Sequence, residues 1–143
     1  MFFGMTFISL ISFSQDSLTI TSLHDKLFGH NPRPIRYFKQ TIGNYINYYG
    51  LVKKTKEIFV IRSTKISHDT AYAFYYANEE LLYCEFIIWL NPSKRKGQLF
   101  RYYIDKGKII STKENPQMNG DLFFLLSKSS ELFRASKQFI NAK

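Results

Sequence analysis

The chain of 143 residues contains a single cysteine, Cys84, and this scarcity limits how the fold can be held together. One thiol cannot close a disulfide within the chain, so stability must come from packing. Glycine is also scarce, with 7 residues, and no glycine-rich phosphate-binding loop occurs. Internal repeats and low-complexity segments are absent as well. The length is enough for one domain with a substantial core.

Catalytic and metal-binding patterns are missing too. His24, His30 and His68 lack the spacing of metal ligands, either with each other or with Cys84. Cys84 falls on the apolar side of a predicted strand, whereas reactive thiols need an electropositive and partly exposed site. No pair of carboxylates and no nucleophile with a base can be placed together. The sequence therefore predicts no catalytic residue, no metal site and no cofactor, and we expect a non-enzymatic protein.

Charge is absent from the beginning of the chain. Residues 2–14 are apolar or small and uncharged, with Ser12 and Ser14 before the polar pair Gln15-Asp16. This pattern is typical of a secretory signal peptide, although no Lys or Arg precedes it, and it is too short to span a bilayer. The alternative is an N-terminal strand or helix buried in the core. We predict a signal peptide over 1–14, a domain over 15–143, no transmembrane span, and a periplasmic or secreted location.

Acidic residues are few, 11 against 20 Lys and Arg, so the net charge is +9. Such a balance suits nucleic acids, acidic glycans or anionic lipid surfaces. The basic residues are dispersed, however, and their local clusters lie beside turn-like sequence: Lys53-Lys54 with Lys56, and Lys94-Arg95-Lys96. Short charge runs of this kind are usually solvated loops. A polyanion or nucleic-acid binder is therefore the alternative function, and nucleic acid is not the expected partner.

Aromatic residues are abundant, at 17% of the chain, and favour strands. Alternating patterns predict strands over 57–63, 70–77, 82–90, 98–104 and 108–113. A three-residue loop over 78–80 would place Tyr72 opposite Phe86, a loop over 91–97 would place Phe86 opposite Tyr102, and a turn over 105–107 would place Tyr102 opposite Ile110. These registers gather the apolar residues on one face, so we predict that Phe86, Ile88, Tyr102 and Ile110 are buried together.

Helices are expected on both sides of these strands. Apolar residues from Pro34 to Tyr49 recur at spacings of three and four, after a short helical turn at Leu23–Phe28. Residues 121–139 also follow a helical period, with a strand over 122–126 and a helix from Ser130 as the alternative. The predicted fold class is α+β: an N-terminal helix, a four- to five-stranded antiparallel meander and a C-terminal helix.

One short motif resembles a known group of proteins. The segment from Tyr102 to Ile110 reads Tyr-Tyr-Ile-Asp-Lys-Gly-Lys-Ile-Ile. It is similar to a strand-turn-strand pattern in small exported bacterial proteins, mostly uncharacterised and many from Bacteroidetes. Lys106 stands where a turn-forming residue such as Asn is more usual in that group. The resemblance implies export and the α+β fold, and it implies no activity and no functional residue.

The second face of the predicted sheet holds the candidate binding residues. Tyr83, Trp89, Arg101 and Tyr103 share this face, and Trp, Tyr and Arg are the residue types most often found at interaction hot spots. The alternative is that a helix covers the face, which Ala71 and Ala73 would allow at close range. We therefore predict an exported domain that binds a protein or a component of the cell envelope through these four residues.

Overall fold

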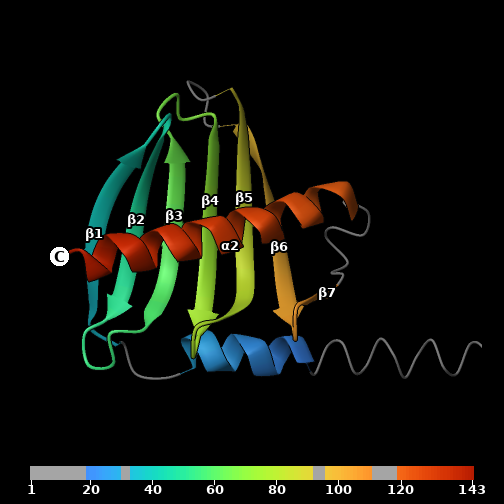
Figure 1. Ribbon diagram of the computed structural model, residues 1–143. Helices are drawn as coiled ribbons and strands as arrows, with labels where there is room; N and C mark the ends of the chain where they lie inside the picture. Colours follow the sequence, from blue (N-terminus) through green and yellow to red (C-terminus); the bar gives the residue numbers. More distant parts are fainter. Residues whose placement is uncertain (1–18, 30–32, 92–95, 111–118) are drawn as a thin grey trace, which may run out of the picture.

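A seven-stranded antiparallel sheet forms the centre of the protein (Figure 1). The computed structural model describes residues 19–29, 33–91, 96–110 and 119–143. The strands lie side by side in sequence order: β1 (Ile35–Ile42), β2 (Tyr45–Val52), β3 (Ile58–Lys65), β4 (Thr70–Ala77), β5 (Glu80–Asn91), β6 (Lys96–Asp105) and β7 (Lys108–Ile110). The α+β class and the meander are confirmed, but seven strands replace the predicted four or five.

Two helices pack on the sheet. The C-terminal helix α2 (Asn119–Asn141) crosses one face, running from the β6 and β7 side to the β1 side (Figure 1). Residues 19–28 form the N-terminal helix, which lies at one end of the sheet. Its Leu23 and Leu27 pack with Leu82, Tyr83 and Ile110 in a second, smaller core. Each helix therefore buries an apolar stripe, but the two occupy different faces.

The predicted helix over Pro34–Tyr49 is wrong, because this segment forms the β1–β2 hairpin. The strands are joined by Gly43 and Asn44, and Gly43 has φ of +56°, which suits the first position of a two-residue hairpin turn. Spacings of three and four also arise when both faces of a strand carry apolar residues. Here Phe38 and Tyr49 belong to the core beneath α2. The many Ile, Tyr and Thr residues of this stretch favour strands over a helix.

The register of β4 and β5 is confirmed, with Tyr72 opposite Phe86 and Phe74 opposite Cys84. The turn between them is shorter than the predicted three residues, since Ala77 pairs with Glu80. A β-bulge between Tyr75 and Tyr76 restores the register.

The two later registers differ from the prediction. Phe86 pairs with Phe100 rather than Tyr102, a shift of two residues that keeps every side chain on its expected face. At β6–β7 the turn is Lys106-Gly107, both with positive φ, so Tyr103 pairs with Ile110. This shift of one residue moves Ile110 to the opposite face, into the core of the N-terminal helix. Tyr102 and Ile110 are therefore buried in different cores, while Phe86 and Ile88 are only partly buried.

The C-terminal helix is confirmed and runs unbroken through Ser127–Ser130, so the alternative with a strand over 122–126 is wrong. Leu125 and Leu132 of α2 are buried against the sheet. Along the helix, the buried Ser129 lies between these two leucines, and the buried Ser136 lies about one turn after Leu132. These small residues let the helix approach the strands closely. The hydroxyls of Tyr76 and Ser129 lie 2.6 Å apart, which joins α2 to β4 by a hydrogen bond.

Some predictions fall outside the described residues. These are the signal peptide over 1–14, residues 94 and 95 of the second basic cluster, and the end of the last predicted strand over 111–113.

Candidate functional site

The described residues cover the sheet face opposite α2 only in part. Cross-strand pairing aligns Arg62, Ala73, Glu85 and Arg101 in one row across β3 to β6. The next row holds Thr64, Ala71, Ile87 and Leu99, and Trp89 lies one pair further along β5. We refer to these nine residues as the open sheet face.

The four predicted binding residues occupy two separate places. Tyr83 and Tyr103 are directly paired, with ring centroids 4.8 Å apart, and both belong to the core of the N-terminal helix. Tyr83 is only 6% exposed. Trp89 lies six residues further along β5, which corresponds to roughly 20 Å of strand. Arg101 is exposed and lies between these two places. The structure thus groups Arg101 and Trp89 with the open sheet face and places both tyrosine rings beneath a helix.

One part of the predicted binding face is covered by a helix, and another part is covered by neither described helix. The N-terminal helix covers the rows around Tyr75, Tyr83 and Tyr103. Beside them a hollow of about 200 Å³ lies over Ala71 and Ala73, and all of its described lining residues come from the strands β3, β4 and β5. Leu99 next to it is 42% exposed. The small alanine side chains therefore create a depression that neither described helix fills.

Glu85 links the covered and the open rows. The Tyr83 hydroxyl donates a hydrogen bond of 2.7 Å to Glu85 Oε1, and Arg101 Nε lies 3.7 Å from the same oxygen. Burial and the bond to Glu85 raise the pKa of Tyr83, so its hydroxyl remains a donor at neutral pH. A hydrogen bond with Tyr75 raises the pKa of Arg62. With two arginines and one carboxylate, the open sheet face carries a surplus of one positive charge.

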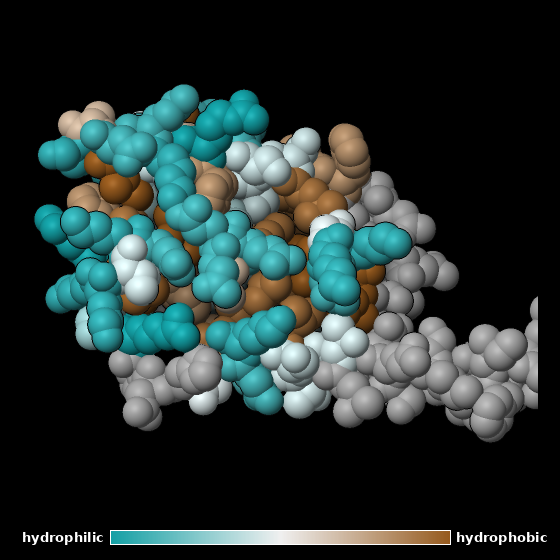
Figure 2. Space-filling model, turned by 60° about the horizontal axis from the view of Figure 1, so that its bottom comes forward, coloured by the Kyte–Doolittle hydropathy of each residue, from teal (hydrophilic) through white to brown (hydrophobic). Residues whose placement is uncertain are grey.

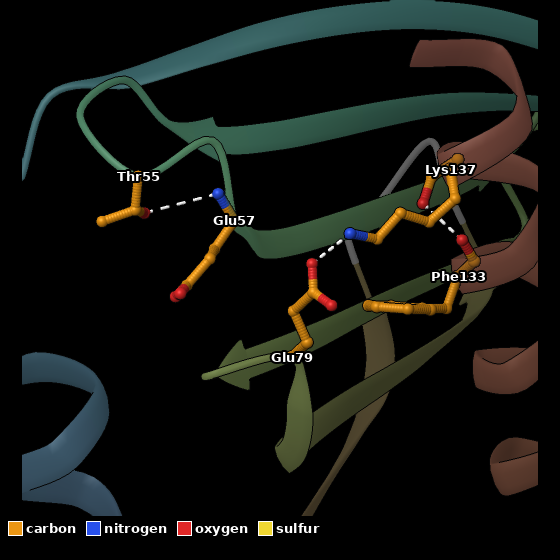
Figure 3. A network of polar contacts seen from close by, with 6 residues as sticks. Thr55, Glu57, Glu79, Phe133 and Lys137 are labelled. Atoms are coloured by element: carbon orange, nitrogen blue, oxygen red, sulfur yellow. Dashed lines mark hydrogen bonds and ion pairs between the residues drawn. The ribbon is translucent and has the colours of Figure 1, made fainter. Parts of the chain in front are cut away.

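A groove of about 680 Å³ lies between α2 and the turns that follow β4 and β6. Its apolar lining includes Tyr76, Leu81 and Phe133. Glu79, in the β4–β5 turn, forms an ion pair with Lys137 of α2, as Figure 3 shows. Two acidic and two basic side chains line the groove, Glu79, Glu80, Arg134 and Lys137, so its described lining has no net charge that would select a ligand of either sign.

A second groove, of about 860 Å³, lies where α2 ends beside β1, β2 and β3. We refer to it as the basic groove, because its lining includes Arg36, Lys53, Lys56, Lys137 and Lys143. The short charge run that includes Lys53 and Lys56 indicated only a solvated loop in the sequence. The wrong helix prediction for Pro34–Tyr49 also gave no indication that Arg36, on the edge strand β1, lies on the sheet face that packs against α2. No local signal could have brought together residues that lie so far apart in the chain.

Groups with reactive or metal-binding chemistry are sparse in the described part of the chain. Cys84 is fully buried, and burial raises the pKa of its thiol to about 12, so it stays protonated at neutral pH. Among the residues that the structure describes, no group of three or more His, Cys, Asp or Glu side chains could hold a metal ion. Neither of the two described helices has the length and apolar character needed to cross a membrane.

No protein-family model, curated protein or solved structure matches this chain.

Proposed function

We propose that the protein is an exported, non-enzymatic domain that binds a partner protein through the open sheet face. The observation that carries this proposal is the hollow over Ala71 and Ala73, which neither described helix fills, beside the exposed Leu99 and Arg101. Exposed apolar surface next to a polar rim is typical of protein contact sites. Arg101 and Trp89, which both belong to this face, are residue types often found at interaction hot spots.

The chemistry of this face indicates what a partner should present. The hollow of about 200 Å³ is below the roughly 300 to 1,000 Å³ of small-molecule pockets, so it suits a single inserted side chain. Its apolar wall is formed by Ile87, and Arg62 and Glu85 lie on its polar side. Because the face has one surplus positive charge, we expect an apolar side chain flanked by an acidic residue.

Export rests on the leader pattern over residues 2–14 and on the resemblance of the Tyr102–Ile110 motif to exported bacterial proteins. Mass spectrometry of the protein from its native host tests this part. We expect a mature terminus at or near Gln15. An intact Met1 on protein recovered from the cytoplasm would overturn the export proposal and leave the binding proposal standing.

Affinity capture from the extracytoplasmic fraction of the native host tests the binding proposal. The patch variant is Leu99→Ser with Arg101→Ser. The matched control is Ile66→Ser with Lys108→Ser, which also removes one exposed apolar and one exposed basic side chain, outside the open sheet face. We expect one protein to be enriched by the wild type and the control but lost by the patch variant. That protein, once purified, should bind with an affinity that falls about tenfold or more in the patch variant. Equal binding by all three proteins would refute the proposal.

The basic groove favours a second candidate, binding of polyanions, because it gathers cations that are dispersed in the sequence. A polyanion such as heparin should then bind with an affinity that falls steeply as salt increases. Capture of a partner protein through the open sheet face should depend much less on salt, which distinguishes the two functions.

A further inference from the structure

The basic groove combines an apolar floor with a cationic rim. The floor is formed by side chains from three strands and the last turn of α2: Phe38, Leu51, Val52, Ile58 and Ile140. Figure 2 shows hydrophobic surface between hydrophilic side chains on the left, the side on which α2 ends in Figure 1. A volume of about 860 Å³ falls within the roughly 300 to 1,000 Å³ of small-molecule sites. A purely polar ligand would leave this floor unused.

The described side chains that line this rim carry more positive than negative charge. Lys137 pairs with Glu79, but no Asp or Glu is among the described residues that line the groove. Arg36 Cζ lies 4.9 Å from the ring centroid of Phe38, and Lys143 Nζ lies 4.8 Å from that of Phe139. Cations resting on aromatic rings keep their full charge and still have donors for an anion.

The loop that carries two of these cations is held by its backbone. The N–H of Lys53 donates to the carbonyl oxygen of Pro34 at 3.0 Å, and the N–H of Lys56 donates to that of Val52 at 2.8 Å. The N–H of Val52 donates to the carbonyl oxygen of Glu57 at 2.9 Å. Lys53 and Lys56 therefore project from an ordered turn, and an anion would not have to order the loop on binding.

The orientation of a ligand follows from the end of α2. The carbonyl end of a helix carries a partial negative charge, which disfavours an anion beside Asn141. The strand side of the groove has no such opposing dipole and holds Arg36, Lys53 and Lys56. An anionic head is therefore best placed on the strand side, with an apolar chain extending beneath Ile140.

We propose that the basic groove binds a single-chain anionic amphiphile of the long-chain fatty acid type. Its carboxylate contacts Arg36, Lys53 and Lys56, and its alkyl chain lies on Phe38, Leu51, Ile58 and Ile140. This site is separate from the open sheet face, so the proposal stands or falls independently of partner binding there. It competes with polyanion binding, which would use the same groove.

Titration of the full domain with dansyl-labelled undecanoate tests the proposal, since the fluorescence of this probe rises in an apolar site. Palmitate should displace the probe, and hexadecanol, which has the same chain without the charge, should displace it at least tenfold less well. Lys53→Gln with Lys56→Gln should weaken binding by about tenfold, because each exposed ion pair contributes modestly. Ile140→Ser should weaken it as well without any change in charge. The matched control, Lys39→Gln with Lys108→Gln, removes two exposed cations outside the groove and should leave the affinity unchanged.

Circular dichroism of each variant shows whether it is folded before titration, and the lysine substitutions lie at exposed positions. Three results would overturn the proposal. The first is no saturable binding of the probe by the wild type. The second is equal weakening in the groove and control variants, which indicates diffuse attraction. The third is displacement by heparin or by vesicles of anionic phospholipid but not by palmitate, which indicates a polyanion or membrane-surface site.

Discussion

The hydrogen bond between Tyr76 and Ser129 is the contact through which the attachment of α2 to the sheet can be measured. Both residues are buried, each with 3% of its surface exposed. Their hydroxyl oxygens lie 2.6 Å apart, and the Tyr76 hydroxyl also lies 3.4 Å from the carbonyl oxygen of Ser129. Burial raises the pKa of Tyr76, as expected for a phenol that remains neutral inside the core.

The expected magnitudes follow from which groups lose a partner. Tyr76→Phe leaves the Ser129 hydroxyl without its phenol partner, and we expect a cost of about 1 to 2 kcal/mol in the free energy of unfolding. Ser129→Ala leaves the Tyr76 hydroxyl with the more distant carbonyl oxygen, for a cost of about 1 kcal/mol. The double variant removes both hydroxyls together and should cost about 1.5 kcal/mol. The double-mutant cycle should therefore give a coupling of about 1 kcal/mol.

Urea unfolding monitored by far-ultraviolet circular dichroism measures all four proteins. Tyr37→Phe with Ser130→Ala provides the control cycle, because both hydroxyls lie on exposed residues far apart on the sheet edge and on α2. Its coupling should be close to zero. Additive effects in the Tyr76–Ser129 cycle would refute the reasoning, since they would mean that the two hydroxyls do not meet in solution.

Three further predictions follow from single residues. Lys106 has φ of +51° in the β6–β7 turn, so Lys106→Asn should raise the free energy of unfolding by about 0.5 to 1 kcal/mol in urea titrations; a loss would show that the lysine side chain has a stabilising contact. Burial raises the pKa of Cys84 from 9.0 to about 12. Below pH 9 the thiol is protonated in both states and does not change the free energy of unfolding. Between pH 9 and pH 12 only the unfolded thiol ionises, which lowers the free energy of unfolding by about 1.4 kcal/mol per pH unit. Tyrosines with a raised pKa add to this decline equally in both proteins, so Cys84→Ala should show a slope between pH 9 and pH 10 that is shallower by about 1 kcal/mol per unit, and an unchanged slope would contradict the assignment. An added Cβ at Gly97 would lie 2.8 Å from Trp89 Cε3 and 3.0 Å from the Ile88 carbonyl oxygen. Gly97→Ala should therefore shift the fluorescence of the single tryptophan and cost about 1 kcal/mol, while Gln98→Ala leaves the emission unchanged.

Sequence patterns were most reliable where one period was unambiguous. The alternation from Tyr72 to Phe86 correctly predicted two strands, their pairing and the face that packs under α2. The helical period over 121–139 predicted α2, because its apolar residues lie on one stripe and its far side is solvated. The pattern failed between Pro34 and Tyr49, where apolar residues on both faces of two strands imitate the spacing of a helix.

Turn geometry was only partly readable from the sequence. The Lys106-Gly107 turn needs two residues with positive φ, and lysine gives no local indication of that conformation. The resulting shift of one residue moved Ile110 from one core to the other. The candidate site depended on the same details. Tyr83, Trp89, Arg101 and Tyr103 share a sheet face as predicted, but the position of the N-terminal helix decides which of them remain accessible.

By itself, the sequence determined the charge surplus, the strand alternation after β3, and the C-terminal helix, because each depends on residues close together in the chain. Only the tertiary structure decided which surfaces are available. The N-terminal helix covers one end of the second sheet face and leaves the hollow over Ala71 and Ala73 open. Arg36 and Lys143, which lie 107 positions apart in the sequence, line one groove because α2 ends beside β1. Such proximity arises from packing between distant segments, which no local period encodes.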